Sequence, residues 1–169
     1  YLPYWRPNID YRNNYAEKPE QGGGIILDDI HEFDLLFWLN DFNKVDDHKL
    51  IFDKISDLEL GTEDMCIGSF KFSNGVMGLV ITDYLQQELA RNCKVVGEKG
   101  NLSWDLHQSS VWFANKEGRE ELFNVEGYDD NQPYIDEVNY FLNCVKDKER
   151  TFNGIDRAMG LLNYCVVRK

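Results

Sequence analysis

The feature that most restricts the fold is an alternation of apolar and polar residues that begins at Met65. From 65 to 72 the side chains change character at nearly every position, as they do along a half-buried β-strand. Ser73-Asn74-Gly75 follows, and an Asn-Gly pair between two alternating runs is typical of a tight hairpin turn. A second run covers 76–84, so the sequence predicts an antiparallel hairpin as the framework of the chain.

Short strands continue beyond this hairpin. They are predicted over 92–96, 100–106, 111–114 and 119–124, and glycine-containing turns at 97–100 and 115–118 separate them into an antiparallel meander. Apolar residues at helical spacing predict two amphipathic helices, within 134–145 and 155–166. Together these elements predict an α+β fold with an open, mostly antiparallel sheet that carries helices on one face.

The first 62 residues are less regular. Residues 1–20 are expected to form an extended loop with one helical turn around 11–16. Gly22-Gly23-Gly24 then precedes a run over 25–39, which is too long for an ordinary strand and is predicted as a helix. Residues 41–62 are polar and weakly patterned, and we expect a loop there.

Whole-chain properties exclude several classes of function. The chain has 169 residues and is 43 % hydrophobic, enough for the core of one domain. The net charge of -12 repels nucleic acid and anionic lipid. No run of about 18 apolar residues exists, so a soluble protein is expected, and the wide spacing of the cysteines favours a cytoplasmic one. The chain opens on Tyr1-Leu2-Pro3 without Met or a signal peptide, and we expect a fragment of a longer protein.

Metal binding has little support in the sequence. His48 and His107 have no carboxylate or cysteine at ligand spacing and are expected to be surface or turn residues. The cysteines are widely spaced and are expected to be reduced thiols; they are Cys66, Cys93, Cys144 and Cys165. We therefore expect neither a metal site nor a disulfide framework.

The strands over 65–84 carry apolar residues on both of their faces. The predicted helices cover one face of this sheet. A second copy of the chain is the simplest cover for the other face, so a homodimer or homotetramer formed through the sheet is expected.

Asp28 and His31 are the first candidates for chemistry. On a helix two residues three positions apart are neighbours, and a carboxylate beside an imidazole raises its basicity and orients it. Such a pair is suited to proton transfer. The same spacing also fits a polar stripe of a helix that faces solvent. On spacing alone, the solvent-facing stripe is the favoured interpretation.

The glycine triplet at 22–24 permits two interpretations. Backbone N–H groups at a helix start bind anions, but no complete phosphate-binding motif is present. Close backbone packing at the entry to the helix is the favoured interpretation.

Aromatic rings and guanidinium groups are concentrated in the N-terminal segment. Trp5, Arg6, Tyr11 and Arg12 lie within eight positions of one another. This composition suits the stacking and hydrogen bonding of a polar ring such as a sugar, and equally suits an arm packed over the core.

The segment 22–39 resembles a motif of the Gfo/Idh/MocA oxidoreductases, GGG-x-x-x-D-x-x-H-E-x-D-x-x-x-W-L. The resemblance continues in family order through 62–64, 72–75, 96–100, 104–105 and 134–141. Residues 4–7 and 10–12 resemble the segment that precedes the glycines in a sugar-modifying branch. The resemblance thus covers nearly the whole chain.

This resemblance implies a C-terminal, substrate-binding and oligomer-forming domain of the glyceraldehyde-3-phosphate dehydrogenase-like type. NAD or NADP would be bound mainly by an N-terminal Rossmann domain that this chain lacks. His31 would be the acid/base that exchanges a proton with a hydroxyl of a sugar, nucleotide sugar or cyclitol, and Asp28 would orient it. Trp5, Arg6, Tyr11, Arg12 and Asp29 would bind the substrate.

Two departures from the family pattern bear on these residues. Many members space the Asp and the His four apart, so Asp28, Asp29 or both could fill the carboxylate role. Glu17-Lys18-Pro19 matches a family tripeptide that belongs to the nucleotide-binding domain, and we interpret this match as coincidence. The alternative to a dehydrogenase is a non-catalytic carbohydrate-binding or assembly module of the same fold.

Overall fold

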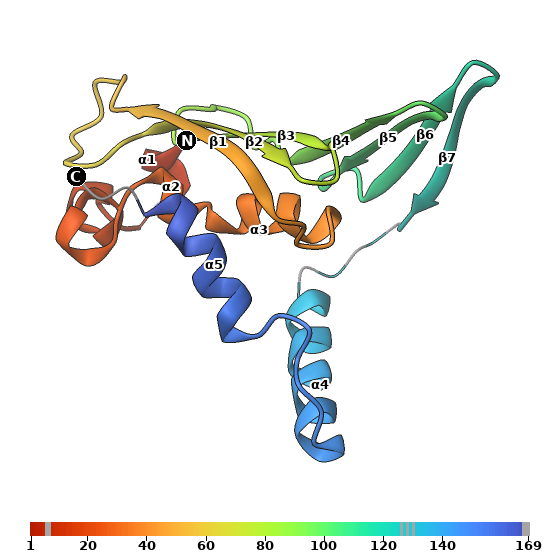
Figure 1. Cartoon of the computed structure of the whole chain (residues 1–169). Coiled ribbons are helices and arrows are strands. Elements are labelled where there is room, and N and C mark those ends of the chain that lie inside the picture. Colours follow the sequence, from red (N-terminus) through yellow and green to blue (C-terminus); the bar gives the residue numbers. More distant parts are fainter. Residues whose placement is uncertain (6–7, 126, 128, 130, 167–169) are drawn as a thin grey trace. The chain divides into compact units, whose positions relative to one another are not determined.

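In the computed structural model the chain forms two compact units, and residues 1–5, 8–125, 127, 129 and 131–166 are described (Figure 1). The first unit comprises Tyr1–Gln87 and Asn153–Lys169, and the second comprises Glu88–Phe152. Each unit contains one antiparallel sheet, one of three strands and the other of four. The predicted α+β class with antiparallel strands is confirmed.

The sheet of the first unit consists of β1 (Val45–Asp53), β2 (Met65–Phe72) and β3 (Met77–Asp83), in that order. The predicted hairpin is confirmed, because β2 pairs antiparallel with β3 and the Phe72 N–H donates to the Val76 carbonyl at 2.9 Å across the turn. Alternation places Cys66, Phe70 and Phe72 in the core and leaves the other face of the sheet outward.

The strand β1 corrects the prediction of a loop over 41–62. Its pattern is obscured by a register shift between Val45 and Asp47 and by His48, which occupies an inward position. The His48 ring stacks on the Phe70 ring with centroids 6.0 Å apart, so His48 belongs to a strand, although its side chain is largely exposed. A polar edge strand lacks the apolar alternation that would have revealed it.

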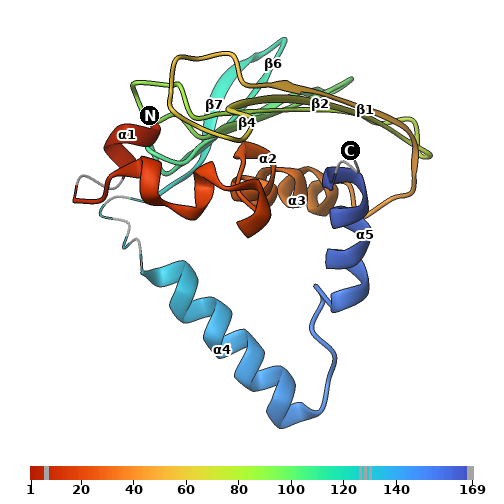
Figure 2. The ribbon, with the colours of Figure 1, turned by 90° about the vertical axis from the view of Figure 1, so that its left-hand side faces the viewer.

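Three helices lie on the inner face of this sheet, as Figure 2 shows; they are α2 (Ile25–Asp28), α3 (Ile30–Leu39) and α5 (Ile155–Cys165). Phe33 and Phe37 of α3 are buried, and both rings meet the Phe70 ring edge-on. Edge-to-face packing of this kind adds to the free energy gained from burial alone. The helix predicted over 155–166 is confirmed.

The helix predicted over 25–39 is interrupted at Asp29. Asp29 has φ −99° and ψ 26°, which lies outside the helical region, and it separates α2 from α3. Its N–H still donates to the Ile25 carbonyl at 2.9 Å, and its own carbonyl accepts from the Glu32 N–H at 2.9 Å. The motif segment therefore contains a bend at its carboxylate pair.

The N-terminal segment consists of single turns. They are α1 (Leu2–Trp5) and the 3-10 turns η1 (Tyr11–Asn13), η2 (Tyr15–Glu17) and η3 (Pro19–Gln21). The helical turn expected around 11–16 is divided between η1 and η2. Ala16 is buried, and its carbonyl accepts from the Thr62 hydroxyl at 2.8 Å, which ties the segment to the loop before β2.

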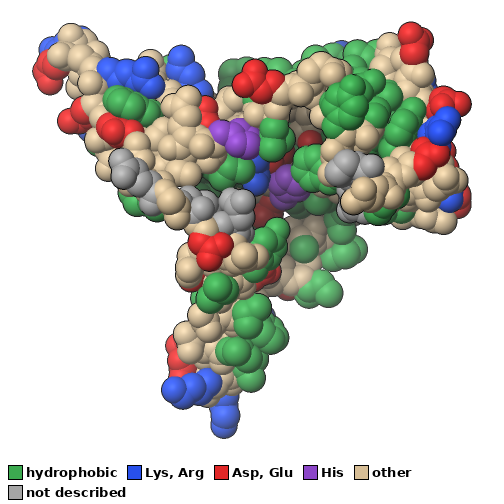
Figure 3. All heavy atoms as spheres, turned by 180° about the vertical axis from the view of Figure 1, so that it is seen from behind, with side chains coloured by type: hydrophobic (Ala, Val, Ile, Leu, Met, Phe, Trp, Pro, Cys, Tyr) green, Lys and Arg blue, Asp and Glu red, His purple; other side chains and the backbone are tan. Residues whose placement is uncertain are grey.

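The second unit contains β4 (Asn92–Gly97), β5 (Gly100–Asp105), β6 (Ser110–Asn115), β7 (Gly118–Asn124) and α4 (Gln132–Asp147). The strands pair in sequence order, which confirms the predicted meander. Hydrophobic side chains follow one side of α4, drawn in green in Figure 3, and confirm its amphipathic character. Among the described residues no helix combines the length and apolar character needed to cross a membrane.

Candidate active site

The glycine triplet is packed against backbone and against a carboxylate. A Cβ on Gly23 would lie 2.6 Å from the Ala16 carbonyl oxygen, and a Cβ on Gly24 would overlap the Glu63 side chain. Gly24 also has φ +110°, a conformation that L side chains rarely adopt. The preferred interpretation, close packing at the helix entry, is confirmed.

Glu63 also occupies the amino end of α2. Its carbonyl accepts from the Ile25 N–H at 3.2 Å, and Oε1 accepts from the Ile26 N–H at 3.4 Å. The carboxylate therefore lies where a bound phosphate would have to lie, and it would repel one. The glycine triplet does not fit the pyrophosphate of a dinucleotide, so this chain has no cofactor cradle there.

Asp28, Asp29 and His31 lie together at the bend between α2 and α3. Asp28 ends α2, Asp29 forms the bend, and His31 is the second residue of α3. The His31 side chain is 53 % exposed, and its Nε2 lies 3.1 Å from Oε1 of Glu32. The imidazole is thus open to solvent and next to the Glu32 carboxylate, and its pairing with Asp28 or Asp29 stays a prediction.

Tyr84 fixes the position of the Asp28 carboxylate. Its hydroxyl donates to Oδ2 of Asp28 at 2.5 Å, across 56 positions of sequence. The backbone of Tyr84 is also held, because its N–H donates to the Asp64 carbonyl and its carbonyl accepts from the Leu2 N–H, each at 3.0 Å. The end of β3 is therefore joined to the motif segment.

The environment of this site shifts two groups toward their protonated forms. Burial, the hydrogen bond to Asp28 and the charge of Asp29 together raise the pKa of the Tyr84 phenol. Burial also raises the pKa of Asp34, which lies one turn beyond His31 on α3. Tyr84 consequently remains a hydrogen-bond donor throughout the neutral range.

The predicted substrate-binding residues of the N-terminal segment differ in exposure and in the contacts that they make. Trp5 lies on α1 with 65 % of its surface exposed, whereas Arg6 lies outside the described residues. Tyr11 packs partly against the core, and its hydroxyl accepts from the Glu59 N–H at 3.3 Å. Of the predicted substrate-binding residues that the structure describes in this segment, Trp5 presents the largest exposed aromatic surface to a ligand.

Arg12 is held by two carboxylates. Its Nε and Nη2 donate to the two oxygens of Asp10, each at 2.8 Å, and Nη1 donates to Oε2 of Glu59 at 3.0 Å. These contacts raise the pKa of Arg12 and lower the pKa of Asp10. A substrate would have to displace them, so in this structure Arg12 joins η1 to the loop before β2.

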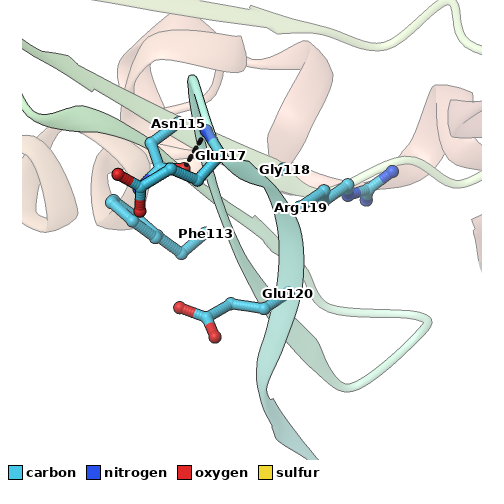
Figure 4. A pocket seen from close by; sticks show the side chains of 6 residues that line it. All are labelled: Phe113, Asn115, Glu117, Gly118, Arg119 and Glu120. Atoms are coloured by element: carbon cyan, nitrogen blue, oxygen red, sulfur yellow. Dashed lines mark hydrogen bonds between the residues drawn. The ribbon is translucent and has the colours of Figure 1, made fainter.

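Metal-binding groups and the cavity of the second unit are the other features to compare with the predicted site residues. Within the described ranges no three His, Cys, Asp or Glu side chains are grouped as metal ligands. A cavity of about 180 Å³ lies at the β6–β7 hairpin (Figure 4), where the Glu117 N–H donates to the Asn115 side chain. Its lining residues belong to the second unit and include none of the predicted site residues.

Sequence reasoning missed Tyr84 and Glu63. The position of Tyr84 carries a usable signal, since it shares the inward parity of Val80 and Thr82 and must therefore face the helices. No comparable signal exists for Glu63, because its contact with Gly24 depends on the path of the intervening chain. Chemically, the bend carries an exposed imidazole, His31, three positions from an anchored carboxylate, Asp28, and residues of these types can move a proton to or from a bound hydroxyl.

Comparison with known proteins assigns the chain to a family. A model described as the C-terminal alpha/beta domain of an oxidoreductase family matches residues 4–159. No curated protein sequence matches the chain.

Solved structures share the fold at low identity. An aldose-aldose oxidoreductase from Caulobacter crescentus, complexed with glycerol, has a TM-score of 0.76 and 16% identity, covering 92% of this chain and 48% of that one. The UDP-N-acetylglucosamine 3-dehydrogenase GnnA from Acidithiobacillus ferrooxidans has a TM-score of 0.70 and 18% identity, with coverages of 83% and 44%. GenD2 from gentamicin A biosynthesis, in complex with NAD, has a TM-score of 0.70 and 18% identity, with coverages of 88% and 46%. The chain therefore spans a little under half the length of these structures.

Proposed function

Since the chain belongs to the Gfo/Idh/MocA oxidoreductase family as its C-terminal alpha/beta domain, we propose that it is the substrate side of an NAD(P)-dependent enzyme. The substrate would be a hydroxyl-bearing sugar, nucleotide sugar or cyclitol. The single observation that carries this proposal is the bend at Asp29, which groups an exposed His31 with an Asp28 carboxylate anchored by Tyr84.

In this proposal His31 is the acid/base. An imidazole ionises near neutral pH, so it can accept the proton of a substrate hydroxyl and return it in the reverse reaction. Asp28 and Asp29 orient the imidazole or accept hydrogen bonds from neighbouring hydroxyls. Trp5 offers an aromatic face on which a sugar ring can stack.

NAD or NADP belongs, in this proposal, to a separate Rossmann domain. The cofactor supplies hydride transfer in such enzymes. The occupied amino end of α2 supports this division, because the Glu63 carboxylate leaves no phosphate site at the glycine triplet. The neighbours also support it, since GenD2 was solved with NAD and is about twice as long as this chain.

We further propose that the outer face of the β1-β2-β3 sheet joins two copies of the chain. Ile51, Ile67 and Ile81 face one another across the three strands on this side. Leu79 is 62% exposed and Met77 is 80% exposed on the same face. Exposed apolar side chains grouped on one face in this way favour a self-complementary contact between copies.

The test of the enzymatic proposal uses the complete enzyme, meaning this chain joined to its nucleotide-binding domain. UDP-N-acetylglucosamine, glucose and myo-inositol serve as probes, each with NAD and with NADP, and formation of reduced cofactor is followed by absorbance. His31→Asn should lower kcat by about 100-fold or more if the imidazole is the acid/base.

The matched control is His107→Asn, because His107 is exposed in the turn between β5 and β6. This variant should keep the activity of the unaltered enzyme. An unchanged rate in His31→Asn would contradict the acid/base role and favour a non-catalytic carbohydrate-binding module. Absence of reduced cofactor with every probe, together with no NAD or NADP binding by calorimetry, would contradict the dehydrogenase itself.

A further inference from the structure

Tyr84 lies outside the motif segment yet makes the most specific contact with it. Its side chain is only 7% exposed, and its hydroxyl lies 2.5 Å from Oδ2 of Asp28. An O–H···O distance this short is typical of a hydrogen bond to an ionised acceptor, which is about twice as strong as one between neutral groups.

The direction of this hydrogen bond is fixed by chemistry. A phenol has one proton, and burial beside Asp28 and Asp29 raises the pKa of Tyr84, so that proton is retained. Tyr84 therefore donates and Asp28 accepts. One carboxylate oxygen of Asp28 is committed to the Tyr84 hydroxyl, and no hydrogen bond to Oδ1 is found among the described residues.

Tyr84 is itself held rigidly. Its N–H donates to the Asp64 carbonyl, and its carbonyl accepts from Leu2. The Asp64 side chain is fully buried, and its Oδ1 accepts from the Ile55 N–H at 2.8 Å. The backbone bonds of Tyr84 thus hold its phenol at the end of the sheet. Asp28, in contrast, lies next to the bend at Asp29, where helical hydrogen bonding alone does not fix the orientation of its carboxylate.

We propose that Tyr84 is a positioning residue of the proton-transfer site. It holds the Asp28 carboxylate in one orientation relative to α3, so that Oδ1 stays aligned for catalysis in every turnover. This inference rests on the proposed function, because it requires that Asp28 take part in the reaction.

The first test is Tyr84→Phe in the complete enzyme, assayed with whichever of the three probes is turned over fastest. The substitution removes one hydroxyl and keeps the buried ring. Misalignment of a catalytic group lowers the rate of the chemical step, so kcat should fall about 10-fold while KM changes less than about twofold.

Tyr164→Phe is the matched control. Tyr164 is a partly buried ring that packs against Phe37 and Phe70, and its hydroxyl makes no hydrogen bond within the described part of the chain. This variant should retain full kcat. An equal loss in Tyr84→Phe and Tyr164→Phe would overturn the proposal.

A double-mutant cycle separates positioning from general structural damage. Once Asp28→Ala has removed the acceptor, the Tyr84 hydroxyl has no carboxylate to hold, so adding Tyr84→Phe should change kcat by less than about twofold. Independent, multiplicative losses in the double variant would show that Tyr84 acts elsewhere and would overturn the proposal.

A second variant covers the case in which Tyr84→Phe fails to fold, which circular dichroism would reveal. Asp28→Glu keeps Tyr84 and the charge but moves the carboxylate by one methylene, and it should lower kcat about as much as Tyr84→Phe. Full kcat in Asp28→Glu would overturn the positioning role.

The two levels of inference fail in distinguishable ways. If His31→Asn and Asp28→Ala both lower kcat while Tyr84→Phe does not, only the role of Tyr84 is wrong. If His31→Asn and Asp28→Ala both leave kcat unchanged, the proposed function itself is wrong.

Discussion

The Glu63 carboxylate lies directly against the Cα of Gly24, and the two residues together define how the motif segment enters its first helix. A Cβ on Gly24 would lie 2.6 Å from Cδ of Glu63, closer than real Cβ contacts come. The same carboxylate accepts from the Ile26 N–H. One acidic side chain thus both excludes side chains at Gly24 and caps α2.

Gly24→Ala should therefore destabilise the chain. The substitution combines a steric overlap with Glu63 and an unfavourable φ of +110°. Such strain costs about 1–3 kcal/mol, measurable as a lower free energy of unfolding in urea. The matched control is Gly160→Ala within α5, where a Cβ meets no atom within 4 Å. Alanine favours helix there, so Gly160→Ala should be neutral or stabilising by up to about 1 kcal/mol. Equal losses in the two variants would refute the packing argument.

Asp64→Ala should lower the free energy of unfolding substantially, because it removes the hydrogen-bond acceptor of several donors in the loop before β2. The carboxylate accepts from the N–H groups of Ile55 and Ser56, at 2.8 and 3.1 Å, and from the Ser56 hydroxyl. Leaving such groups unpaired costs about 2–4 kcal/mol of unfolding free energy. Asp57→Ala, on the exposed surface of the same loop, should change it by less than about 0.5 kcal/mol. Thermal unfolding of the two variants side by side distinguishes them, and a similar melting temperature would contradict this role for Asp64.

Stability should fall at alkaline pH because of two buried thiols. Burial and the charge of Glu63 raise the pKa of Cys66 to about 11, and burial beside Cys66 raises the pKa of Cys165 to about 12. In the unfolded chain both thiols ionise near about 8.5. Between these values the folded state holds more protons, so each thiol removes up to about 1.4 kcal/mol of stability per pH unit as the pH rises.

The check is urea unfolding at several pH values from about 8 to 11. Cys165→Ala should show a shallower decline than the unaltered chain, whatever its stability at neutral pH. A decline as steep as that of the unaltered chain would mean that the Cys165 thiol does not contribute.

Leu79→Lys should weaken association between copies. Leu79 lies on the outer face of β3 with most of its side chain exposed, opposite Ser69 of β2. A lysine there would place a charge within the proposed contact, and the molar mass measured by light scattering should fall toward that of one copy. Asp57→Lys changes the charge by more but lies in a loop, so it should leave the molar mass unchanged. A strict monomer of the unaltered chain at high concentration would remove the basis for this contact.

Periodicity predicted the elements whose burial is regular. The hairpin of β2 and β3, the meander of the second unit, α4 and α5 each repeat one pattern over their length, and the structure contains all of them. The strand β1 was missed because the register shift after Val45 and the inward His48 interrupt its alternation. The break at Asp29 was missed because a bend of one residue barely changes the apolar spacing on either side.

The candidate site was predictable only where it is local in sequence. Asp28 and His31 stand out because their spacing and their motif lie within a few positions. The parity of Tyr84 indicates that it faces inward, but its partner Asp28 lies 56 positions away, and no short pattern pairs the two. The ion pairs of Arg12 with Asp10 and Glu59 could not be predicted either. Composition shows that a guanidinium group is present, but it does not show which carboxylates already bind it.

The three bonds made by Tyr84 have a consequence for the order in which the chain folds. Its carbonyl reaches back to Leu2, its hydroxyl to Asp28 and its N–H to Asp64, so each bond closes a loop of different length. Long loops lose the most entropy on closure, and contacts between distant residues form slowly. The β2–β3 hairpin can assemble early from local contacts, but Asp28 acquires its partner only when the longer loop between positions 28 and 84 closes. The contact between Tyr84 and Asp28 is therefore a late product of folding, absent from any intermediate that contains the hairpin alone.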